Sequence, residues 1–96
     1  MILTVKSESK TELIDVTSEV QKLVQEAGLT DGVCMLYVPH TTAGVTINES
    51  ADPSVVRDIT TTLDEAFPRR ADYHHAEGNS DAHIKSSLVG CSELVL

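Results

Sequence analysis

The sequence contains few aromatic residues and few basic ones. Its 96 residues include two tyrosines, one phenylalanine and no tryptophan, so the apolar material is mostly Val, Leu, Ile and Ala. That material suits a sheet packed against helices better than an aromatic-rich barrel. Fifteen acidic residues against seven basic ones give a net charge of −8. Because this excess repels phosphate backbones and no basic stripe opposes it, we expect no nucleic-acid partner.

The sequence motifs of several enzyme classes are also absent. No GxGxxG, GxxxxGK(S/T) or GxSxG segment occurs, so dinucleotide binding, P-loop and α/β-hydrolase chemistry lack their signals. The two cysteines, Cys34 and Cys91, form no CxxC pair, and we expect both to be structural. No signal peptide and no apolar run of membrane-spanning length is visible. These absences predict a single cytoplasmic domain without a membrane partner.

The spacing of apolar residues predicts three helices. The first covers about 18–27, with a capping box at Ser18 and Gln21 and a stop at Gly28. The second begins at Asp52 and Pro53, an N-cap followed by a first-turn proline, and ends before Pro68. The third covers about 81–89 and is closed by glycine.

Extended segments are predicted at 2–6, 11–16, 33–38, 44–48 and 94–96. The continuously apolar run 33–38 suits a central strand buried on both faces, and a turn at 40–42 would pair it with 44–48. The apolar run 94–96 predicts either a strand edge covered by another chain or a shortened form of a longer domain. Together the helices and strands indicate an α+β domain.

The segment 74–85 holds the densest cluster of reactive residue types. His83 is expected in the first turn of the third helix, where unpaired backbone N–H groups favour an anion such as phosphate. Lys85 could add charge there if the helix begins a little later or bends. Gly78 and Asn79 suit a loop that brings amides close to a ligand. His75 and His83 could converge as two imidazole ligands of zinc, manganese or a similar ion. The alternative is a polar loop that caps the following helix.

A second cluster, 39–49, follows the apolar strand. His40 is a candidate acid or base, Thr41 and Thr42 offer hydroxyl donors, and Asn48 and Glu49 offer polar contacts. Loops at strand ends commonly carry function. The alternative is a hairpin turn whose hydroxyls bond to its own backbone.

In order along the chain, these two clusters resemble the YjbQ-like family, whose members are also called secondary thiamine-phosphate synthase-type proteins. The resemblance extends to 11–17 and 51–53, so it covers nearly the whole chain. It implies a compact α+β fold with a mixed β-sheet and about three helices, assembled as a homotrimer. It also implies further strands beyond the last helix, bearing a Gly-Thr-Trp-Gln segment that this sequence does not contain.

The resemblance supplies candidate site residues. His40, His75 and His83 match the family's recurring histidines, while His74 falls at a variable place. The other matching positions are Asn48, Glu49, Asn79 and Lys85. The implied activity is weak transfer of a pyrimidine-methyl group from its diphosphate to thiazole phosphate, so the expected partner is a small phosphorylated metabolite.

Roles can be assigned within this hypothesis. His75 and His83 would contact a divalent metal (zinc, magnesium or manganese) or phosphate, and His40 would be the acid or base. Glu49 would hold the metal or orient substrate, and Lys85 would assist the leaving diphosphate. The remaining binding residues would be Thr41, Thr42, Asn48 and Asn79. Two other hypotheses are metal-assisted hydrolysis of a phosphorylated metabolite and a non-enzymatic trimeric module that binds a metal or anion.

Overall fold

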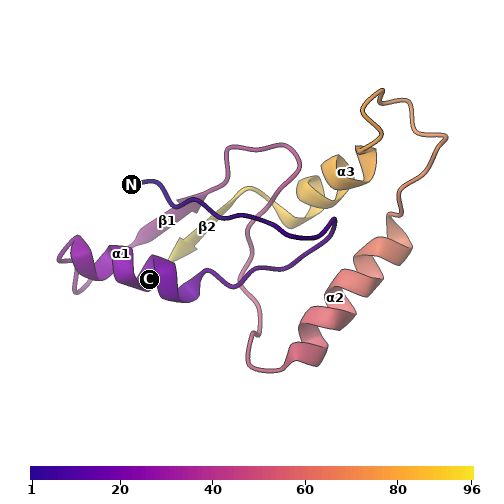
Figure 1. Ribbon diagram of the computed structural model, residues 1–96. Helices are drawn as coiled ribbons and strands as arrows, with labels where there is room; N and C mark the ends of the chain where they lie inside the picture. The colour runs from indigo at the N-terminus through magenta and orange to yellow at the C-terminus, as the bar shows by residue number, and fades with distance from the viewer.

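The computed structural model describes all residues, 1–96. Three helices and a two-stranded sheet follow one another in the order α1 (Thr17–Glu26), β1 (Cys34–Tyr37), α2 (Pro53–Ala66), α3 (Ser80–Val89) and β2 (Ser92–Val95). The predicted α+β class and all three helices are therefore confirmed. The molecule is elongated, 50 × 29 × 21 Å, with α1 and the sheet at one end and α2 at the other (Figure 1). No helix combines the length and apolar character needed to span a bilayer.

Local signals explain where the helices begin. The Asp52 carboxylate accepts hydrogen bonds from the backbone N–H of Ser54, at 2.9 Å, and from its hydroxyl, so the predicted N-cap of α2 is confirmed. The predicted capping box of α1 is wrong. The Asp15 carboxylate instead accepts from the backbone N–H of Thr17, at 2.9 Å, and the helix begins at Thr17.

Glycines end α1 and α3, as predicted. Gly28 and Gly90 have φ angles of 73° and 96°, a region that side chains with a Cβ rarely adopt. Only Cys91 separates Gly90 from the first residue of β2. The short chain between α3 and the sheet therefore depends on a backbone angle that only glycine reaches easily.

The strand pairing differs from the prediction. β1 pairs with β2 in an antiparallel register that sets Cys34 opposite Val95 and Tyr37 opposite Ser92. Residues 44–48 form no strand and do not pair with β1, and neither 2–6 nor 11–16 is a strand. A continuous apolar run predicts a strand but does not identify its partner, because pairing depends on contacts distant in sequence.

One face of the sheet is open in the single chain. Met35 and Tyr37 of β1 are 64% and 63% exposed, and Leu94 of β2 is 65% exposed. Because side chains alternate across a strand, Cys34 and Leu36 point to the opposite, half-buried face. The prediction that this strand is buried on both faces is therefore wrong for the single chain.

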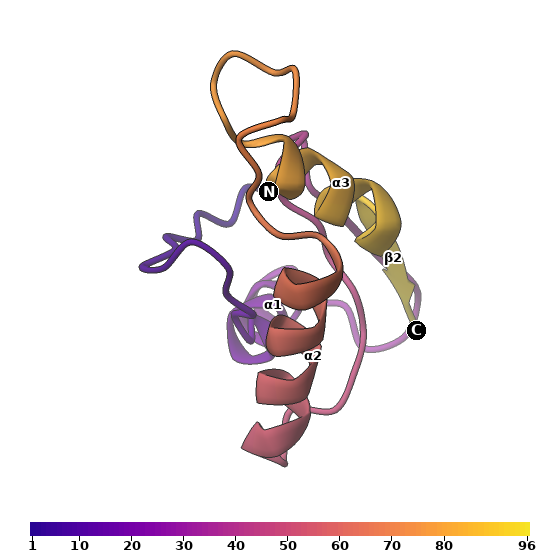
Figure 2. The same cartoon turned by 90° about the vertical axis from the view of Figure 1, so that its right-hand side faces the viewer.

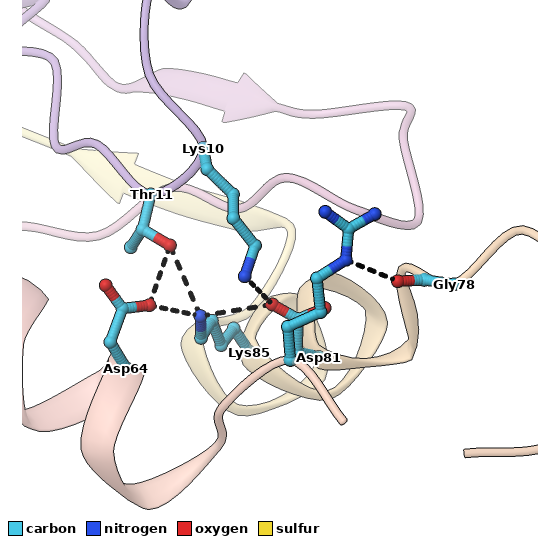
Figure 3. Close-up of polar contacts among 7 residues, drawn as sticks. Lys10, Thr11, Asp64, Gly78, Asp81 and Lys85 are labelled. Atoms are coloured by element: carbon cyan, nitrogen blue, oxygen red, sulfur yellow. Dashed lines mark hydrogen bonds and ion pairs between the residues drawn. The ribbon is translucent and has the colours of Figure 1, made fainter. Parts of the chain in front are cut away.

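The most deeply buried side chains are charged. Asp81 and Lys85, one turn apart on α3, are only 2% and 8% exposed, and no apolar residue reaches that depth. The Lys85 ammonium donates to Thr11 Oγ1 at 3.2 Å, to a carboxylate oxygen of Asp64 and to Asp81 Oδ2 at 3.4 Å. The Lys10 ammonium lies 3.2 Å from the same Asp81 oxygen. Figure 3 draws these contacts as dashed lines. We call these five residues the lysine–aspartate cluster.

The cluster joins parts of the chain that are distant in sequence. Lys10 and Thr11 belong to the N-terminal segment, Asp64 to α2, and Asp81 and Lys85 to α3. Two carboxylates face two ammonium groups, and of these Asp81 and Lys85 are buried while the side chains of Lys10 and Asp64 are half exposed. Removing one partner of a buried pair typically costs about 3–5 kcal/mol, because the remaining charge is left uncompensated.

The cluster lowers the pKa of both carboxyl groups. The hydrogen bond from Lys85, followed by that from Thr11, holds the pKa of Asp64 below its ordinary value of 3.8. Burial alone would raise the pKa of Asp81, but the Lys10 and Lys85 ammonium groups hold it below its ordinary value as well. Since the unfolded chain binds protons more readily at these sites, their contribution to stability is lost as the pH falls through the lowered values.

Replacing Asp64→Asn should therefore destabilise the chain in a pH-dependent way. At pH 7 we expect a free energy of unfolding lower than wild type by about 1 kcal/mol, because the Asp64 side chain is half exposed. The deficit should shrink as the pH falls from the ordinary aspartate value of 3.8, since the wild type then loses the same contribution. Urea unfolding at several pH values measures the difference in free energy of unfolding between the variant and wild type. Asp58→Asn, on the same helix, is the control. A deficit that stays constant down to pH 3 would contradict the lowered pKa.

Candidate functional site

Helix α3 and the loop after β1 form a depression of about 410 Å³. Its lining comes from both predicted clusters, because the loop contributes part of 39–49 and the helix contributes part of 75–85. The lining residues are His40, Thr41, Ala43, His83, Ser86, Ser87, Gly90 and Cys91.

Three contacts hold the loop against α3. The Ser86 hydroxyl donates to the backbone carbonyl of Thr41. The backbone N–H of Val45 donates to the carbonyl of Gly90 at 3.0 Å. Between them, Gly44 lies so close to the helix end that an added Cβ would be 2.6 Å from the Gly90 carbonyl oxygen. The glycine in this loop therefore permits the close approach that brings His40 to the helix.

His83 is the histidine shared by both parts of the site. It lines the depression together with His40. On its other side, its ring centroid lies 5.1 Å from that of His75, with the two ring planes perpendicular. The His75 ring also lies 3.8 Å from a Glu77 carboxylate oxygen. The predicted convergence of His75 and His83 is thus present. The chain between α2 and α3, which precedes His83, projects beyond both helices in Figure 2.

The metal prediction is not supported in the single chain. The rings of His75 and His83 are neighbours, with centroids 5.1 Å apart, but no group of three or more His, Cys, Asp or Glu side chains comes together in a way that could hold a metal ion. Catalytic zinc takes three protein ligands, and magnesium requires oxygen ligands. The single chain therefore does not assemble the predicted site for zinc, magnesium or manganese.

Other predicted site residues lie apart from the depression. Thr42, Asn48 and Glu49 are exposed and do not line it, and the Glu49 backbone N–H donates to the Asn48 side chain at 2.7 Å. Asn79 precedes the first turn of α3, and its buried Oδ1 has no hydrogen-bond partner. Lys85 lies in the lysine–aspartate cluster. None of these five side chains lines the depression with His40 and His83.

The prediction that His83 lies beside unpaired backbone N–H groups in the first turn of α3 also needs correction. Helix α3 begins at Ser80, one residue earlier than predicted, and the His83 backbone N–H bonds to the Asn79 carbonyl at 3.4 Å. That N–H is therefore already paired. What His83 contributes to the depression is its side chain.

Five lining residues were not predicted as site residues, and three of them, Ser86, Ser87 and Cys91, carry a hydroxyl or a thiol. Ser86 and Ser87 follow His83 by three and four positions, the spacing that places helical side chains on one face, so this signal was available in the sequence. Cys91 was expected to be structural, but it is exposed and lines the depression. Its position follows from the β2 register, which the sequence did not predict.

The chemistry of the lining suits an anionic ligand. It contains no carboxylate and no lysine or arginine, and its polar groups are imidazole, hydroxyl and thiol. Imidazoles and hydroxyls can both donate hydrogen bonds to an anion. His40 and His83, on the same depression, are the side chains there of the type that most often acts as a general acid or base.

Comparison with known proteins gives a consistent result. A family model described as UPF0047 protein YjbQ-like matches residues 1–96. UPF0047 protein MJ1081 of Methanocaldococcus jannaschii is 50% identical over 92 residues, which cover 96% of this chain and 67% of that protein. UPF0047 protein YugU of Bacillus subtilis is 47% identical over 95 residues, covering 98% and 72%.

Solved structures resemble the chain closely. An uncharacterised conserved protein of the YjbQ/UPF0047 family from Clostridium acetobutylicum superposes with a TM-score of 0.90 and 52% identity, over 95% of this chain and 70% of the other. The conserved hypothetical protein TT1486 from Thermus thermophilus superposes with a TM-score of 0.83 and 42% identity, over 92% and 68%.

Replacing Gly44→Ala should push the loop away from α3. The new methyl group would meet the Gly90 carbonyl oxygen at 2.6 Å and Val89 Cγ1 at 2.9 Å. We expect a loss of about 1–3 kcal/mol in the free energy of unfolding, because a backbone atom cannot yield as a flexible side chain can. Urea denaturation measures this loss, and Thr46→Ala, an exposed change two residues further on, is the control. Equal stability of the two variants would show that the loop does not pack as described.

Proposed function

The chain belongs to the UPF0047 YjbQ-like family, and from this premise we propose that its depression binds a small phosphorylated metabolite and exchanges protons with it. The observation that supports this proposal is the meeting of His40 and His83 on one depression without a carboxylate. Two imidazoles with adjacent hydroxyls are suited to a phosphate or diphosphate group.

The reaction proposed is transfer of a pyrimidine-methyl group from its diphosphate to thiazole phosphate. The methylene C–O bond breaks, and the electron pair leaves with the diphosphate. The thiazole ring nitrogen attacks the same carbon and forms the new C–N bond, becoming quaternary without releasing a proton. A protonated imidazole of His40 donates to the departing diphosphate, while His83 and the Ser87 hydroxyl hold it.

Metal-assisted hydrolysis of a phosphorylated metabolite is the second candidate. The approach of His75 to His83, 5.1 Å between ring centroids, is the observation that favours it. Since one chain supplies only these two imidazoles as neighbours, no reaction step is assigned to a metal. Phosphate release without an acceptor substrate would distinguish hydrolysis from transfer.

The transfer reaction has a direct test. Purified protein supplied with pyrimidine-methyl diphosphate and thiazole phosphate, with and without divalent metal, should form thiamine phosphate, measured by chromatography. His83→Gln should lower the rate by about 10²-fold or more, because it removes an imidazole that holds the departing diphosphate. His74→Gln, an exposed neighbouring histidine, is the control. If no condition gives thiamine phosphate, the transferase proposal is wrong. Binding of diphosphate without any product would then support a non-enzymatic binding module.

We also propose that the chain assembles as a homotrimer through the open face of its sheet. The exposed apolar side chains of Met35 and Leu94 support this proposal, because such patches commonly mark protein contacts.

Light scattering should give three times the 10.4 kDa chain mass. Leu94→Lys should reduce that mass, since it places a charge on the open face, whereas Ile2→Lys, at a terminal side chain 92% exposed, should not. A wild-type mass equal to one chain would contradict trimer formation.

A further inference from the structure

Helix α3 presents two functionally different faces. His83 and Ser87, one turn apart, line the depression. Asp81 and Lys85, also one turn apart, are buried in the lysine–aspartate cluster. Residues two positions apart on an α-helix are separated by about 200° around its axis, so the two pairs lie on opposite sides. The helix therefore connects the cluster to the site.

The lysine–aspartate cluster is the main anchor of α3 on its buried side. Lys85 bonds to Asp64 of α2 and to Thr11 of the N-terminal segment, and Asp81 pairs with Lys10. The only extensive contact between helices or strands is that of β1 with β2, so no other helix or strand packs broadly on α3. Figure 3 shows these polar groups converging on the Lys85 ammonium from separate segments.

The Lys85 ammonium has no hydrogen-bonding capacity left for a substrate. A lysine ammonium has three N–H donors. Lys85 Nζ has three acceptors within hydrogen-bond distance, one each on Thr11, Asp64 and Asp81. Its side chain is 10% exposed, and it does not line the depression.

We infer that Lys85, with Asp64, is a positioning residue of the His40–His83 site: it sets the orientation of α3, and thereby of His83, without touching the ligand. This inference rests on the proposed function. It differs from the prediction made from the sequence, in which Lys85 contacts the leaving diphosphate directly. Small displacements have large effects in such sites, since about 1 Å can cost up to 10²-fold in rate.

The Asp64→Asn variant separates the two roles. If Lys85 positions α3, weakening its bond to α2 should reduce affinity for the site's ligand. If Lys85 contacts the ligand, releasing it from Asp64 should leave affinity unchanged or raise it. Because the Asp64 side chain is 50% exposed, this variant should remain folded even if Lys85→Met does not.

Calorimetric titration with inorganic diphosphate is the binding measurement, on variants shown to be folded by circular dichroism. Lys85→Met and Asp64→Asn should each weaken binding roughly tenfold. Lys22→Met, which removes an exposed lysine from α1, should leave it unchanged. Wild-type affinity in folded Asp64→Asn would overturn the inference.

A second readout does not require any ligand. The ring-proton NMR signals of His83, and its nuclear Overhauser contact with the His75 ring 5.1 Å away, report the orientation of α3 directly. Both should change in Asp64→Asn and remain as in wild type in Lys22→Met. If wild type binds no diphosphate, the proposed function fails, but these signals still decide whether the cluster positions His83. Unchanged His83 signals in Asp64→Asn would show that it does not.

Discussion

The interaction on which this structure depends is the buried ammonium of Lys85 with oxygens from Thr11, Asp64 and Asp81. In most small domains an apolar core fixes the elements, but here no apolar side chain is fully buried in the single chain. Buried ion pairs add little net stability compared with apolar residues of similar volume, because desolvation offsets the attraction. Such a cluster instead fixes how α2, α3 and the N-terminal segment lie relative to one another, since few arrangements keep all of its hydrogen bonds.

That geometry determines which side chains reach the depression. With Asp81 and Lys85 turned toward the N-terminal segment, His83 and the serines after it face the loop that carries His40. The loop in turn approaches through Gly44, whose missing side chain makes room for the Gly90 carbonyl. The histidine site is therefore built by two separate constraints, one charged and one steric, that act on the two sides of α3.

Features set by neighbouring residues could be predicted from the sequence. The Asp52 cap and the glycine at position 28 mark helix ends through local hydrogen bonds and backbone angles, and the structure has them as predicted. Pairing of β1 with β2 joins residues about sixty positions apart, for which the sequence carries no local signal. Lys85 was assigned to the site because it follows His83 closely, yet helical geometry places the two on opposite sides, and its acceptors come from α2 and the N-terminal segment.

The central claim is that an anionic ligand meets His40 and His83 while Lys85 stays in its cluster. A crystal structure of the protein with inorganic diphosphate tests this most directly. We predict phosphate oxygens within hydrogen-bond distance of both imidazoles, and the Lys85 ammonium still bonded to Asp64 and Asp81. Diphosphate bound to Lys85, or bound away from both histidines, would contradict it.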